Sequence, residues 1–546
     1  MDVYLSLGSN IGSRIDKIES AIKCISKISE IKKISSFYIT PPMYYVNQPY
    51  FINCALKIKT DIEPIQLIKK ILQIEKNLGR IRTFKNGPRI IDIDIVYYGS
   101  KVIDKSILQI PHPKRLERTF VLKPISDIEP SLKDPLTNKT ISQMLTNLNT
   151  QELIKLPENY NESLKFLSSL KPRNKNDFKI DYMKETLKAI GNPQDKIGRI
   201  IHITGSEGKT STAIYISKIL QKNGYRTALY TSPHIIDIRE RIRFNGKMIS
   251  KKNFLTTLRY VISSSPHIHS AFEYLTLVAL KYFSQISADF SIIEVGMGGV
   301  NDATNVFEKS YCVFTHISNE HSKYLGRSIK KIAENKAGII KENSKCFISN
   351  ANSREVIKII EKKAREKNCY IYIQPDKLES DIYYSNLNLA KWICERILYR
   401  RIKYKDIRIK IPARKQKIKY KGREIILDGA HTPYSIKKIM SKINTEKYRV
   451  CLCGFMRDKK VYRCLGEIIK KGFKKIIITQ SLSPRTMRVE EIKTNERKIA
   501  KIKLLKKAFS KALKYGNICV LGSLYLCGDI ISIIKGKKRI YLNELY

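Results

Sequence analysis

The sequence predicts an α+β domain at the N-terminus, then an α/β domain with a phosphate-binding loop, and a smaller α/β lobe at the C-terminus. With 546 residues, the chain is long enough for about three domains with separate cores. Within residues 87–95, two aspartates alternate with apolar residues, as in a strand buried on one face. Residues 199–211 read as a buried strand, a glycine-rich turn and the start of a helix.

The net charge suggests nucleic-acid binding, but the distribution of the basic residues argues against it. A formal net charge of +52 is what a nucleic-acid-binding protein would carry. Lysine and arginine are nevertheless spread along the whole chain, and isoleucine is similarly abundant, a joint bias typical of AT-rich coding sequence. We therefore expect no specific nucleic-acid partner.

Targeting and redox signals point to a cytoplasmic protein. No apolar run approaches the roughly 20 residues that span a bilayer, and the N-terminus enters a strand directly, without a secretory signal. The eleven cysteines are scattered and form no Cys-x-x-Cys pair, which predicts reduced thiols. The sequence gives no indication of the oligomeric state.

The first domain is expected to open with a short strand at 3–7 and a turn at 8–12 that tolerates positive φ. An amphipathic helix should follow, since apolar residues recur at helical spacing: Ile15, Ile18, Ile22 and Ile25. A second amphipathic helix should end near Glu75.

Asp92 and Asp94 form the main candidate metal site of this domain. Residues two apart on a strand share a face, about 7 Å from each other, and such a carboxylate pair suits magnesium that also holds substrate phosphates. Arg89, three residues earlier, can offset the charge of a nucleotide. For the Asp-x-Asp pattern alone, two solvated aspartates on an edge strand are the simpler interpretation, but the surrounding residues favour the metal site.

Those surroundings are a set of ordered motifs at residues 8–12, 40–42, 48–53, 79–82, 87–95, 110–114 and 118–122. Together they resemble the 6-hydroxymethyl-7,8-dihydropterin pyrophosphokinase family over residues 3–130. The resemblance implies a ferredoxin-like α+β fold and transfer of pyrophosphate from ATP to the hydroxymethyl group of a reduced pterin, with release of AMP.

The resemblance also assigns roles. Asp92 and Asp94 would hold two Mg²⁺ ions, and Arg80 and Arg89 would act with them in catalysis. The ATP would be bound by Glu75, Arg82, His112 and Arg118. The pterin pocket would be formed by Thr40, Pro41, Pro42, Phe51, Asn53 and Phe120. Asn86 replaces a tryptophan of the family on a loop that is about one residue short, so we expect weaker or slower closure over the substrates.

A polar, proline-containing stretch from 130 to about 175 is interpreted as the tail of the first domain followed by a linker. After it, the glycine turn at 205–208 and the helix starting near Lys209 have the geometry of a phosphate-binding loop, in which backbone N–H groups and a helix N-terminus hold an anion. Its glycine spacing differs from the common Walker form, so taken alone it is a moderate signal.

Further motifs follow in order at 230–234, 245–246, 272–273, 294–299, 302–305, 321–326, 336–341, 427–431 and 521–526. The set is similar to the dihydrofolate synthase/folylpolyglutamate synthase family from about residue 162 to the C-terminus. It implies ligation of L-glutamate to dihydropteroate or folates through an acyl phosphate, with release of ADP and phosphate. The implied division is a pyrophosphokinase domain at 1–157, a Mur-ligase-like ATP-binding domain at 158–404 and a glutamate-ligase lobe at 405–546.

By this resemblance, Ser232, Glu294 and His321 would bind Mg²⁺, and Lys209 and Lys336 would be catalytic, Lys336 as a carbamate. Phe272 and Asp302 would lie near the pteroate. ATP would be met by Gly205, Gly208, Lys209, Thr210, Ser211, Asn388, Arg414, Asp428 and His431. This sequence departs from the family pattern at several positions, which include Glu207, Val300, Glu320, Ala413 and Thr432, and we expect these changes to affect rate and nucleotide affinity.

The sequence also allows two other functions. Thr210 resembles the related Mur ligases, which makes a Mur-type amino-acid ligase an alternative for the C-terminal part. The other alternative is a basic nucleic-acid-binding protein with a degenerate enzyme fold. A degenerate site should lack some of the catalytic residues, yet all of them are present: Asp92, Asp94, Lys209, Glu294, His321 and Lys336. The sequence leaves open whether the ligase adds one glutamate or several.

Overall fold

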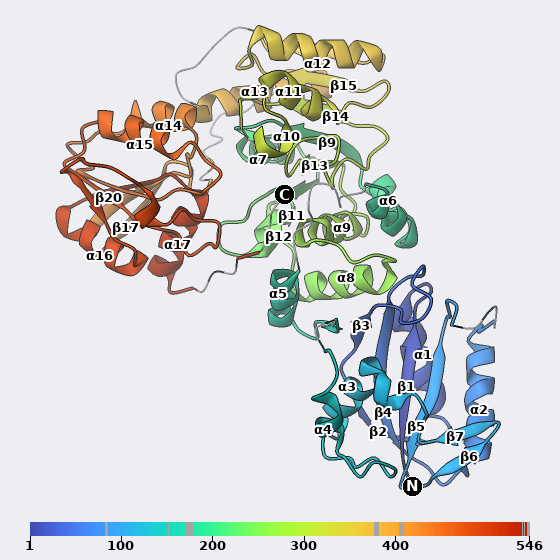
Figure 1. Cartoon of the computed structure of the whole chain (residues 1–546). Helices are drawn as coiled ribbons and strands as arrows, with labels where there is room; N and C mark the ends of the chain where they lie inside the picture. Colours follow the sequence, from blue (N-terminus) through green and yellow to red (C-terminus); the bar gives the residue numbers. More distant parts are fainter. Residues whose placement is uncertain are drawn as a thin grey trace. The chain divides into compact units, whose positions relative to one another are not determined.

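A computed structural model of the chain is shown in Figure 1. It forms two compact units: the first contains residues 1–170, 181–192 and 252–281, and most of the second is residues 193–251 and 282–546. The residues described are 1–81, 84, 86–150, 152–170, 180–320, 322–375, 382–402, 409, 411–537, 539, 541 and 542.

The first unit is built on a mainly antiparallel sheet in the order β5-β1-β4-β3-β8, with β2 beside β4. The central strand β1 (Asp2–Ser9) is antiparallel to both of its neighbours. The other strands are β2 (Glu30–Ile34), β3 (Tyr38–Thr40), β4 (Phe51–Lys59), β5 (Asp92–Tyr98) and β8 (Ile154–Lys155). The strand expected at 3–7 is confirmed, and the strand with the two aspartates begins at the first of them.

Helices cover both faces of this sheet (Figure 1). One face carries α1 (Arg14–Ile25) and α2 (Pro64–Asn77), and the other carries α3 (Thr119–Ile128) and α4 (Ile141–Leu145). The expected apolar face of α1 is confirmed, since Ile15, Ile18 and Ile25 are buried and Ile22 is half-buried. The unit also contains β6 (Ile103–Lys105), β7 (Leu108–Ile110), η1 (Arg115–Glu117), α5 (Tyr160–Ser169), α6 (Ile180–Ala189), α8 (Lys251–Ser264) and α9 (Ala271–Phe283).

The second unit contains an eight-stranded sheet in the order β12-β11-β10-β13-β9-β14-β15-β16. The run from β10 to β16 is parallel, and β11 and β12 form an antiparallel edge. Its strands are β9 (Arg199–Thr204), β10 (Thr227–Tyr230), β11 (Ile242–Phe244), β12 (Lys247–Met248), β13 (Phe290–Glu294), β14 (Tyr311–Phe314), β15 (Lys345–Ile348) and β16 (Tyr370–Ile373).

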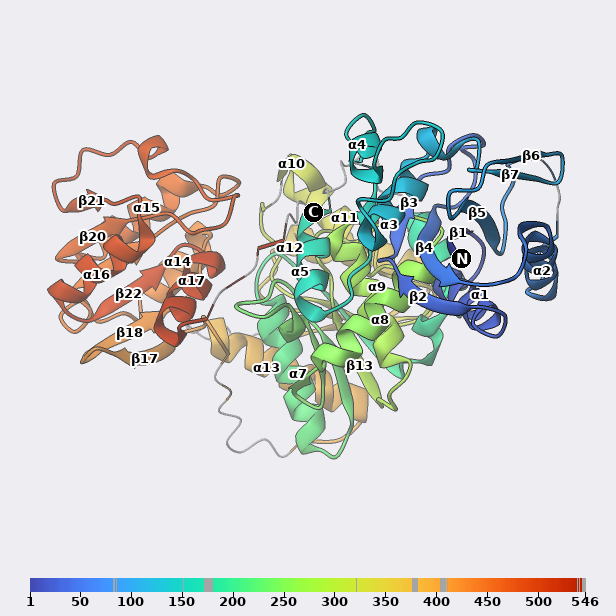
Figure 2. The ribbon, with the colours of Figure 1, turned by 90° about the horizontal axis from the view of Figure 1, so that it is seen from below.

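The two faces of the parallel sheet are covered as in a doubly wound α/β fold. Helices α7 (Lys209–Lys222) and α13 (Ile382–Leu398) lie side by side on one face (Figure 2), and α11 (Ile329–Ala337) and α12 (Arg354–Glu366) cover the other. Shorter elements are η2 (Pro193–Lys196), η3 (Ile238–Arg241) and α10 (Ser322–Leu325).

The C-terminal part of this unit has its own six-stranded sheet, in the order β17-β18-β22-β19-β20-β21. Helices α14 (Pro433–Met440) and α15 (Val461–Lys470) pack on one face, and α16 (Leu505–Tyr515) and α17 (Leu524–Lys535) on the other. The strands are β17 (Gln416–Tyr420), β18 (Arg423–Leu427), β19 (Val450–Cys453), β20 (Lys475–Ile478), β21 (Ile499–Lys501) and β22 (Ile518–Leu521), and η4 is Val489–Glu491. We call this part the C-terminal lobe.

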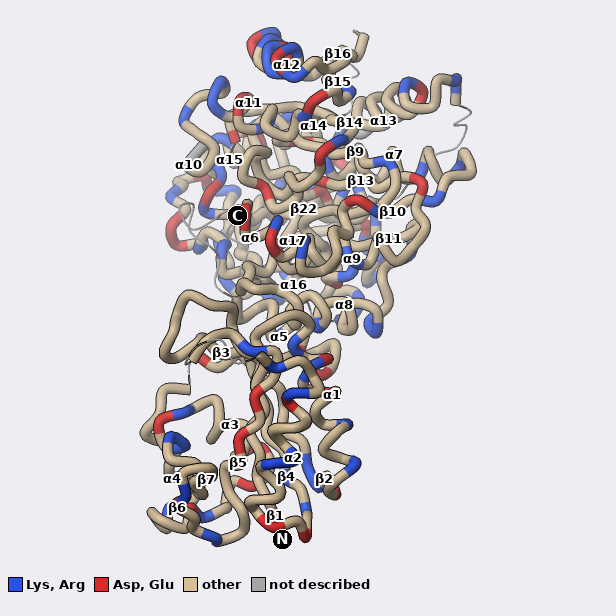
Figure 3. The backbone as a smooth tube through the Cα atoms, turned by 90° about the vertical axis from the view of Figure 1, so that its right-hand side faces the viewer, with Lys and Arg blue, Asp and Glu red and all other residues tan. Residues whose placement is uncertain are grey.

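The distribution of basic residues along the chain and the state of the cysteines agree with what the composition predicts. Lysine and arginine are distributed over the length of the tube in Figure 3 rather than massed in one segment. All eleven cysteines are free thiols. In the part of the chain that the structure describes, no helix has the length and apolar character required to cross a membrane.

Two candidate active sites

The register of the first sheet brings the predicted pterin-binding and metal-binding residues together. Gly8 of β1 pairs with Asn53 of β4 on one side and with Asp92 of β5 on the other. A Cβ atom on Gly8 would lie 2.5 Å from Asn53 Oδ1. A glycine is therefore required for the Asn53 side chain to lie across the central strand.

Asp92 and Asp94 are both half-buried and line the same pocket. Arg80 Nη1 lies 2.6 Å from Asp92 Oδ1, and Arg89 Nη1 lies 2.5 Å from Asp92 Oδ2. Burial, together with the charge of Asp92, raises the pKa of Asp94 to about 7. A divalent cation would relieve this repulsion, and carboxylate oxygens are the ligands that Mg²⁺ prefers. The donor set thus fits the metal.

Positive groups surround these carboxylates. Arg118 Nη1 lies 3.5 Å from Asp94 Oδ2. Among the described residues, the buried Nε atoms of Arg89 and Arg118 have no hydrogen-bond partner, so both guanidinium groups retain donors for an anion. His112 Nε2 is 3.9 Å from Asp94 Oδ2; burial and the charge of Arg118 lower the pKa of His112 to about 4, so its ring is neutral at neutral pH.

Glu75 is a buried carboxylate that contacts Arg80 and the backbone of β5. It is 2% exposed, accepts a 2.7 Å hydrogen bond from the backbone N of Ile93 and pairs with Arg80. Burial raises the pKa of the Glu75 carboxyl. The position predicted to meet ATP is thus one that anchors Arg80 to the start of β5.

Most of the residues predicted to bind the pterin line this pocket: Thr40, Pro41, Phe51, Asn53 and Phe120. Asn53 Nδ2 donates to Thr40 Oγ1 at 2.7 Å. The guanidinium carbons of Arg89 and Arg118 lie 5.5 Å and 5.6 Å from the ring centres of Phe51 and Phe120. The rings of Phe51 and Phe120 therefore lie beside the guanidinium groups of Arg89 and Arg118.

Three other positions named from the sequence for this site are Pro42, Asn86 and Arg82, and only Asn86 is among the described residues that line the pocket. Pro42 is not among the described residues that line the pocket. Asn86 does line it, has φ of 62°, and accepts a 3.0 Å hydrogen bond from Gln48 Nε2 at its carbonyl. Arg82 lies outside the described residues.

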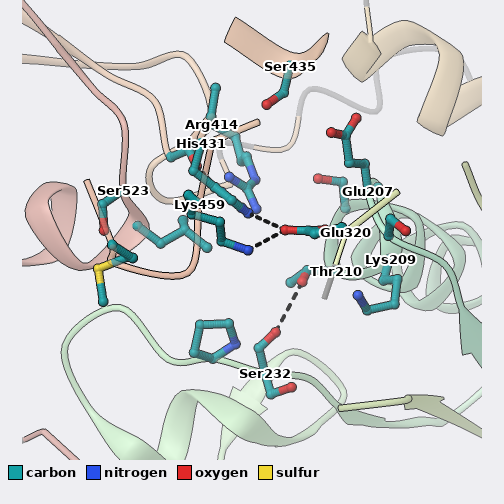
Figure 4. Close-up of a pocket in the computed structure, with 18 of the residues that line it drawn as sticks. Glu207, Lys209, Thr210, Ser232, Glu320, Arg414, His431, Ser435, Lys459 and Ser523 are labelled. Atoms are coloured by element: carbon teal, nitrogen blue, oxygen red, sulfur yellow. Dashed lines mark hydrogen bonds and ion pairs between the residues drawn. The ribbon is translucent and has the colours of Figure 1, made fainter. Parts of the chain in front are cut away.

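The second pocket lies in the second unit, around the loop between β9 and α7 (Figure 4). Gly205 has φ of +150°, and a Cβ there would lie 2.0 Å from Thr315 Oγ1. Gly208 has φ of +84°, and its Cβ would lie 2.5 Å from Asn386 Oδ1. The glycines allow the chain to turn tightly, so the N-terminus of α7 opens into the pocket with Lys209, Thr210 and Ser211.

Glu294, at the end of β13, is a buried carboxylate of this pocket, with 1% exposure. Its Oε1 accepts from Thr210 Oγ1 at 2.8 Å, and its Oε2 accepts from Ser232 N at 3.0 Å. Burial raises the pKa of Glu294. Carboxylate and hydroxyl oxygens here fit a hard cation. The third predicted ligand, His321, lies outside the described residues.

Two lysines converge on one backbone carbonyl. Lys209 Nζ and Lys336 Nζ donate to Gly205 O at 3.0 Å and 2.9 Å. Lys336 is 2% exposed, and burial followed by the charge of Lys209 lowers the pKa of Lys336 to about 7. A substantial fraction of this amine is therefore neutral and nucleophilic near neutral pH.

The C-terminal lobe supplies the other wall of the pocket, through Arg414, Asp428 and His431. Glu320 links the walls: its Oε1 pairs with Lys459 Nζ and lies 3.3 Å from His431 Nε2 (Figure 4). Asp428 is 1% exposed. The three predicted ATP-binding residues of the lobe are thus brought to the phosphate loop.

The remaining predicted residues lie elsewhere. Asn388 is not among the described lining residues, whereas Asn386, two positions earlier on α13, is. Asp302 accepts hydrogen bonds from Met297 N (2.8 Å), Thr304 N (3.0 Å) and Thr304 Oγ1 (2.6 Å), so it organises the loop after β13. Phe272 is buried on α9 of the first unit.

Residues 4–130 match the family model of 7,8-dihydro-6-hydroxymethylpterin-pyrophosphokinase. The pyrophosphokinase of Aquifex aeolicus is 43% identical over 141 residues, which cover 26% of this chain and 88% of that protein. The chain belongs to the pyrophosphokinase family. Membership rests on the part that forms the first sheet and its pocket.

Residues 203–417 match the model of the Mur ligase middle domain. The dihydrofolate synthetase of Saccharomyces cerevisiae is 32% identical over 216 residues, covering 38% of this chain and 49% of that protein. A solved folylpolyglutamate synthase of Mycobacterium tuberculosis, complexed with ADP, superposes with a TM-score of 0.62 at 22% identity over 70% of this chain and 99% of the other; this likeness shows the Mur-ligase-like α/β fold. The chain spans about a fifth to a half of the length of several curated relatives that it matches.

Sequence reasoning missed several residues of the pyrophosphokinase pocket and the second pocket. Gly8 stood in a recognised turn, but its role depends on which residues it pairs with across the sheet. Asn386 is an asparagine like the predicted Asn388, so residue type does not distinguish the two. No motif separates Lys459 from the many other lysines of the chain. Ala413 has φ of 55°, the left-handed region that favours glycine, which explains why the synthase pattern carries glycine there.

Proposed function

We propose that the chain is a bifunctional enzyme of folate biosynthesis. One site transfers pyrophosphate from ATP to 6-hydroxymethyl-7,8-dihydropterin, and the other ligates L-glutamate to dihydropteroate or folates. The observation that carries the proposal is the presence of two separate pockets, each combining buried or half-buried carboxylates with cationic or backbone donors for phosphate. The proposed domains are a ferredoxin-like domain at 1–157, an ATP-binding domain at 158–404 and a ligase lobe at 405–546, in a cytoplasmic protein with small-molecule partners.

In the first site, the hydroxyl oxygen of the pterin bonds to the β-phosphorus of ATP, the bond from that phosphorus to the α-phosphate oxygen breaks, and the hydroxyl proton is released. Mg²⁺ held by Asp92 and Asp94 would neutralise charge on the phosphates. Arg89 and Arg118 bind the same phosphates, and Asn53 orients the pterin between the aromatic rings. Such a reaction needs positioning and charge neutralisation rather than a protein nucleophile.

In the second site, the pteroate carboxylate attacks the γ-phosphorus of ATP, giving an acyl phosphate and ADP. The amine of glutamate then attacks the acyl carbon, an amide forms, and phosphate and a proton leave. The N-terminus of α7 and Lys209 bind the phosphates, and Glu294 with Ser232 would hold Mg²⁺, which screens the phosphate charge. Asn386, rather than Asn388, is the residue of α13 that we assign to this pocket.

Lys336 is proposed to act as a carbamate. Its pKa of about 7 supports this because a neutral amine is the form that adds to carbon dioxide. Lys336→Ala is expected to lower ligase activity by about 10–100-fold, the usual cost of removing a group that supports a metal site. Added short carboxylic acids should restore part of it.

Lys330→Ala, at an exposed position of the same helix, serves as the control and should leave the ligase unchanged. Absence of rescue by any short acid would count against the carbamate.

Gly8→Ala tests the geometry of the first site. The new Cβ must displace the Asn53 amide, so a hydrogen bond to the pterin should be lost, and the KM for the pterin should rise about tenfold. Gly466→Ala, where a Cβ meets nothing within 4 Å, is the control. An unchanged KM for the pterin in Gly8→Ala would refute the assigned role of Asn53.

The two activities can be tested on the wild-type chain by product identification. Mass spectrometry should detect a diphosphorylated pterin after incubation with ATP and hydroxymethyldihydropterin, and a glutamylated product with dihydropteroate, glutamate and ATP. Tetrahydrofolate in place of dihydropteroate distinguishes a ligase that adds one glutamate from one that extends the chain. A missing product would remove the corresponding half of the proposal.

A further inference from the structure

Two of the residues that depart from the synthase pattern contact each other. Glu207 lies in the phosphate loop, and Thr432 lies 225 positions later at the N-cap of α14 in the C-terminal lobe. Thr432 Oγ1 donates a hydrogen bond to Glu207 Oε1. Thr432 Oγ1 also accepts a hydrogen bond from Ser435 N at 3.1 Å. A hydroxyl can make both bonds because it is donor and acceptor at once.

The Glu207 side chain turns away from the side of the loop that would hold phosphates. In Figure 4 it extends towards Ser435, whereas Lys209 and Thr210 lie on the other side. Glu207 is 9% exposed, and its backbone N donates to His316 O at 3.1 Å. Burial raises the pKa of its carboxyl, while the nearby N-terminus of α14 favours negative charge. The Glu207 carboxylate is therefore held against the C-terminal lobe.

A second link runs in the same direction. Glu320, 8% exposed, pairs with Lys459 and lies 3.3 Å from His431, both of which belong to the C-terminal lobe. In both links a buried carboxylate on the phosphate-loop side meets donors of the lobe. Both carboxylates also line the nucleotide pocket, so docking of the lobe and formation of the pocket are coupled.

We propose that Glu207 and Thr432 are a matched pair that docks the C-terminal lobe on the phosphate loop and so sets the affinity of the ligase site for ATP. The proposal rests on the ligase function argued above. Docking keeps Arg414 and His431 beside a nucleotide whose phosphates are bound by the loop. Both members are positioning residues, since neither is placed against the reacting atoms.

A double-mutant cycle in the ligase assay tests the pair. Glu207→Ala and Thr432→Val should each raise the KM for ATP about tenfold, the size expected for loss of a hydrogen bond to a charged group, with kcat nearly unchanged. The double variant should also show a rise of about tenfold, because either single change already breaks the contact. Glu207→Gln keeps an acceptor and Thr432→Ser keeps the hydroxyl, so each should raise the KM for ATP by less than Glu207→Ala or Thr432→Val does. A hundredfold rise in the double variant, or unchanged KM values in the single variants, would overturn the pairing.

Hydrogen exchange gives a readout that does not depend on activity. Glu207→Ala leaves the cap of α14 intact, yet amides in the first turn of α14 should exchange faster, while those of α12 should not change. Unchanged exchange in α14 would overturn the docking role. If the wild type forms no ADP with dihydropteroate and glutamate, the ligase function fails, and the exchange experiment still decides the contact.

Discussion

Asp92→Ala is expected to abolish AMP formation from ATP and hydroxymethyldihydropterin while leaving ligase activity intact. The Asp92 carboxylate lies between the guanidinium groups of Arg80 and Arg89, and Asp92 and Asp94 line the same pocket of the first unit. A bound metal contributes several kcal/mol to charge stabilisation in the transition state, and about 1.4 kcal/mol corresponds to a factor of ten. The rate should therefore fall by about a thousandfold or more, and Asp94→Ala should behave similarly. A coupled-enzyme assay for AMP measures the decrease in the pyrophosphokinase rate.

The control for this experiment is Asp61→Ala, because Asp61 is a fully exposed aspartate of the same unit. It should retain full pyrophosphokinase activity. Loss of both activities in Asp92→Ala would contradict the assignment of separate sites, and retention of AMP formation would contradict the metal site.

Lys209→Ala is expected to remove ADP formation from dihydropteroate, glutamate and ATP. Lys209 begins α7 and lies with Thr210 and Glu294 around the phosphate loop. Removing one donor to charge that develops in a transition state costs about 10²–10³-fold in kcat. AMP formation with the pterin should be unaffected, since that site lies in the first unit.

Lys218→Ala is the matched control, because Lys218 is exposed on the same helix. Ordinary turnover in Lys209→Ala would rule out the phosphate-loop assignment. A folded protein with normal pyrophosphokinase activity rules out general misfolding as the cause.

Local patterns in the sequence were enough to predict the strand that carries Asp92 and Asp94 and the helix that begins at Lys209. Alternation located the strand of Asp92 and Asp94, and the glycine turn with its helix located Lys209. These features depend on neighbours in the chain, where periodicity and glycine conformations act directly.

Features that depend on distant residues were not accessible in this way. The position of Gly8 between Asn53 and Asp92 requires the register of two strand pairs. The contact of Glu207 with Thr432 joins positions 225 apart. The sequence analysis named Asn388, whereas Asn386 is the asparagine of α13 among the described lining residues. Two residues along a helix differ in side-chain direction by about 200°, and residue type alone cannot reveal that difference.

The most direct test of the central claim is to measure AMP and ADP from one preparation of the full chain. Given ATP and hydroxymethyldihydropterin, the protein should release AMP; given ATP, dihydropteroate and glutamate, it should release ADP and phosphate. Asp92→Ala should lose only the first product and Lys209→Ala only the second. Formation of only one of the two nucleotides by the wild type, or loss of both in either variant, would contradict a chain with two independent ATP sites.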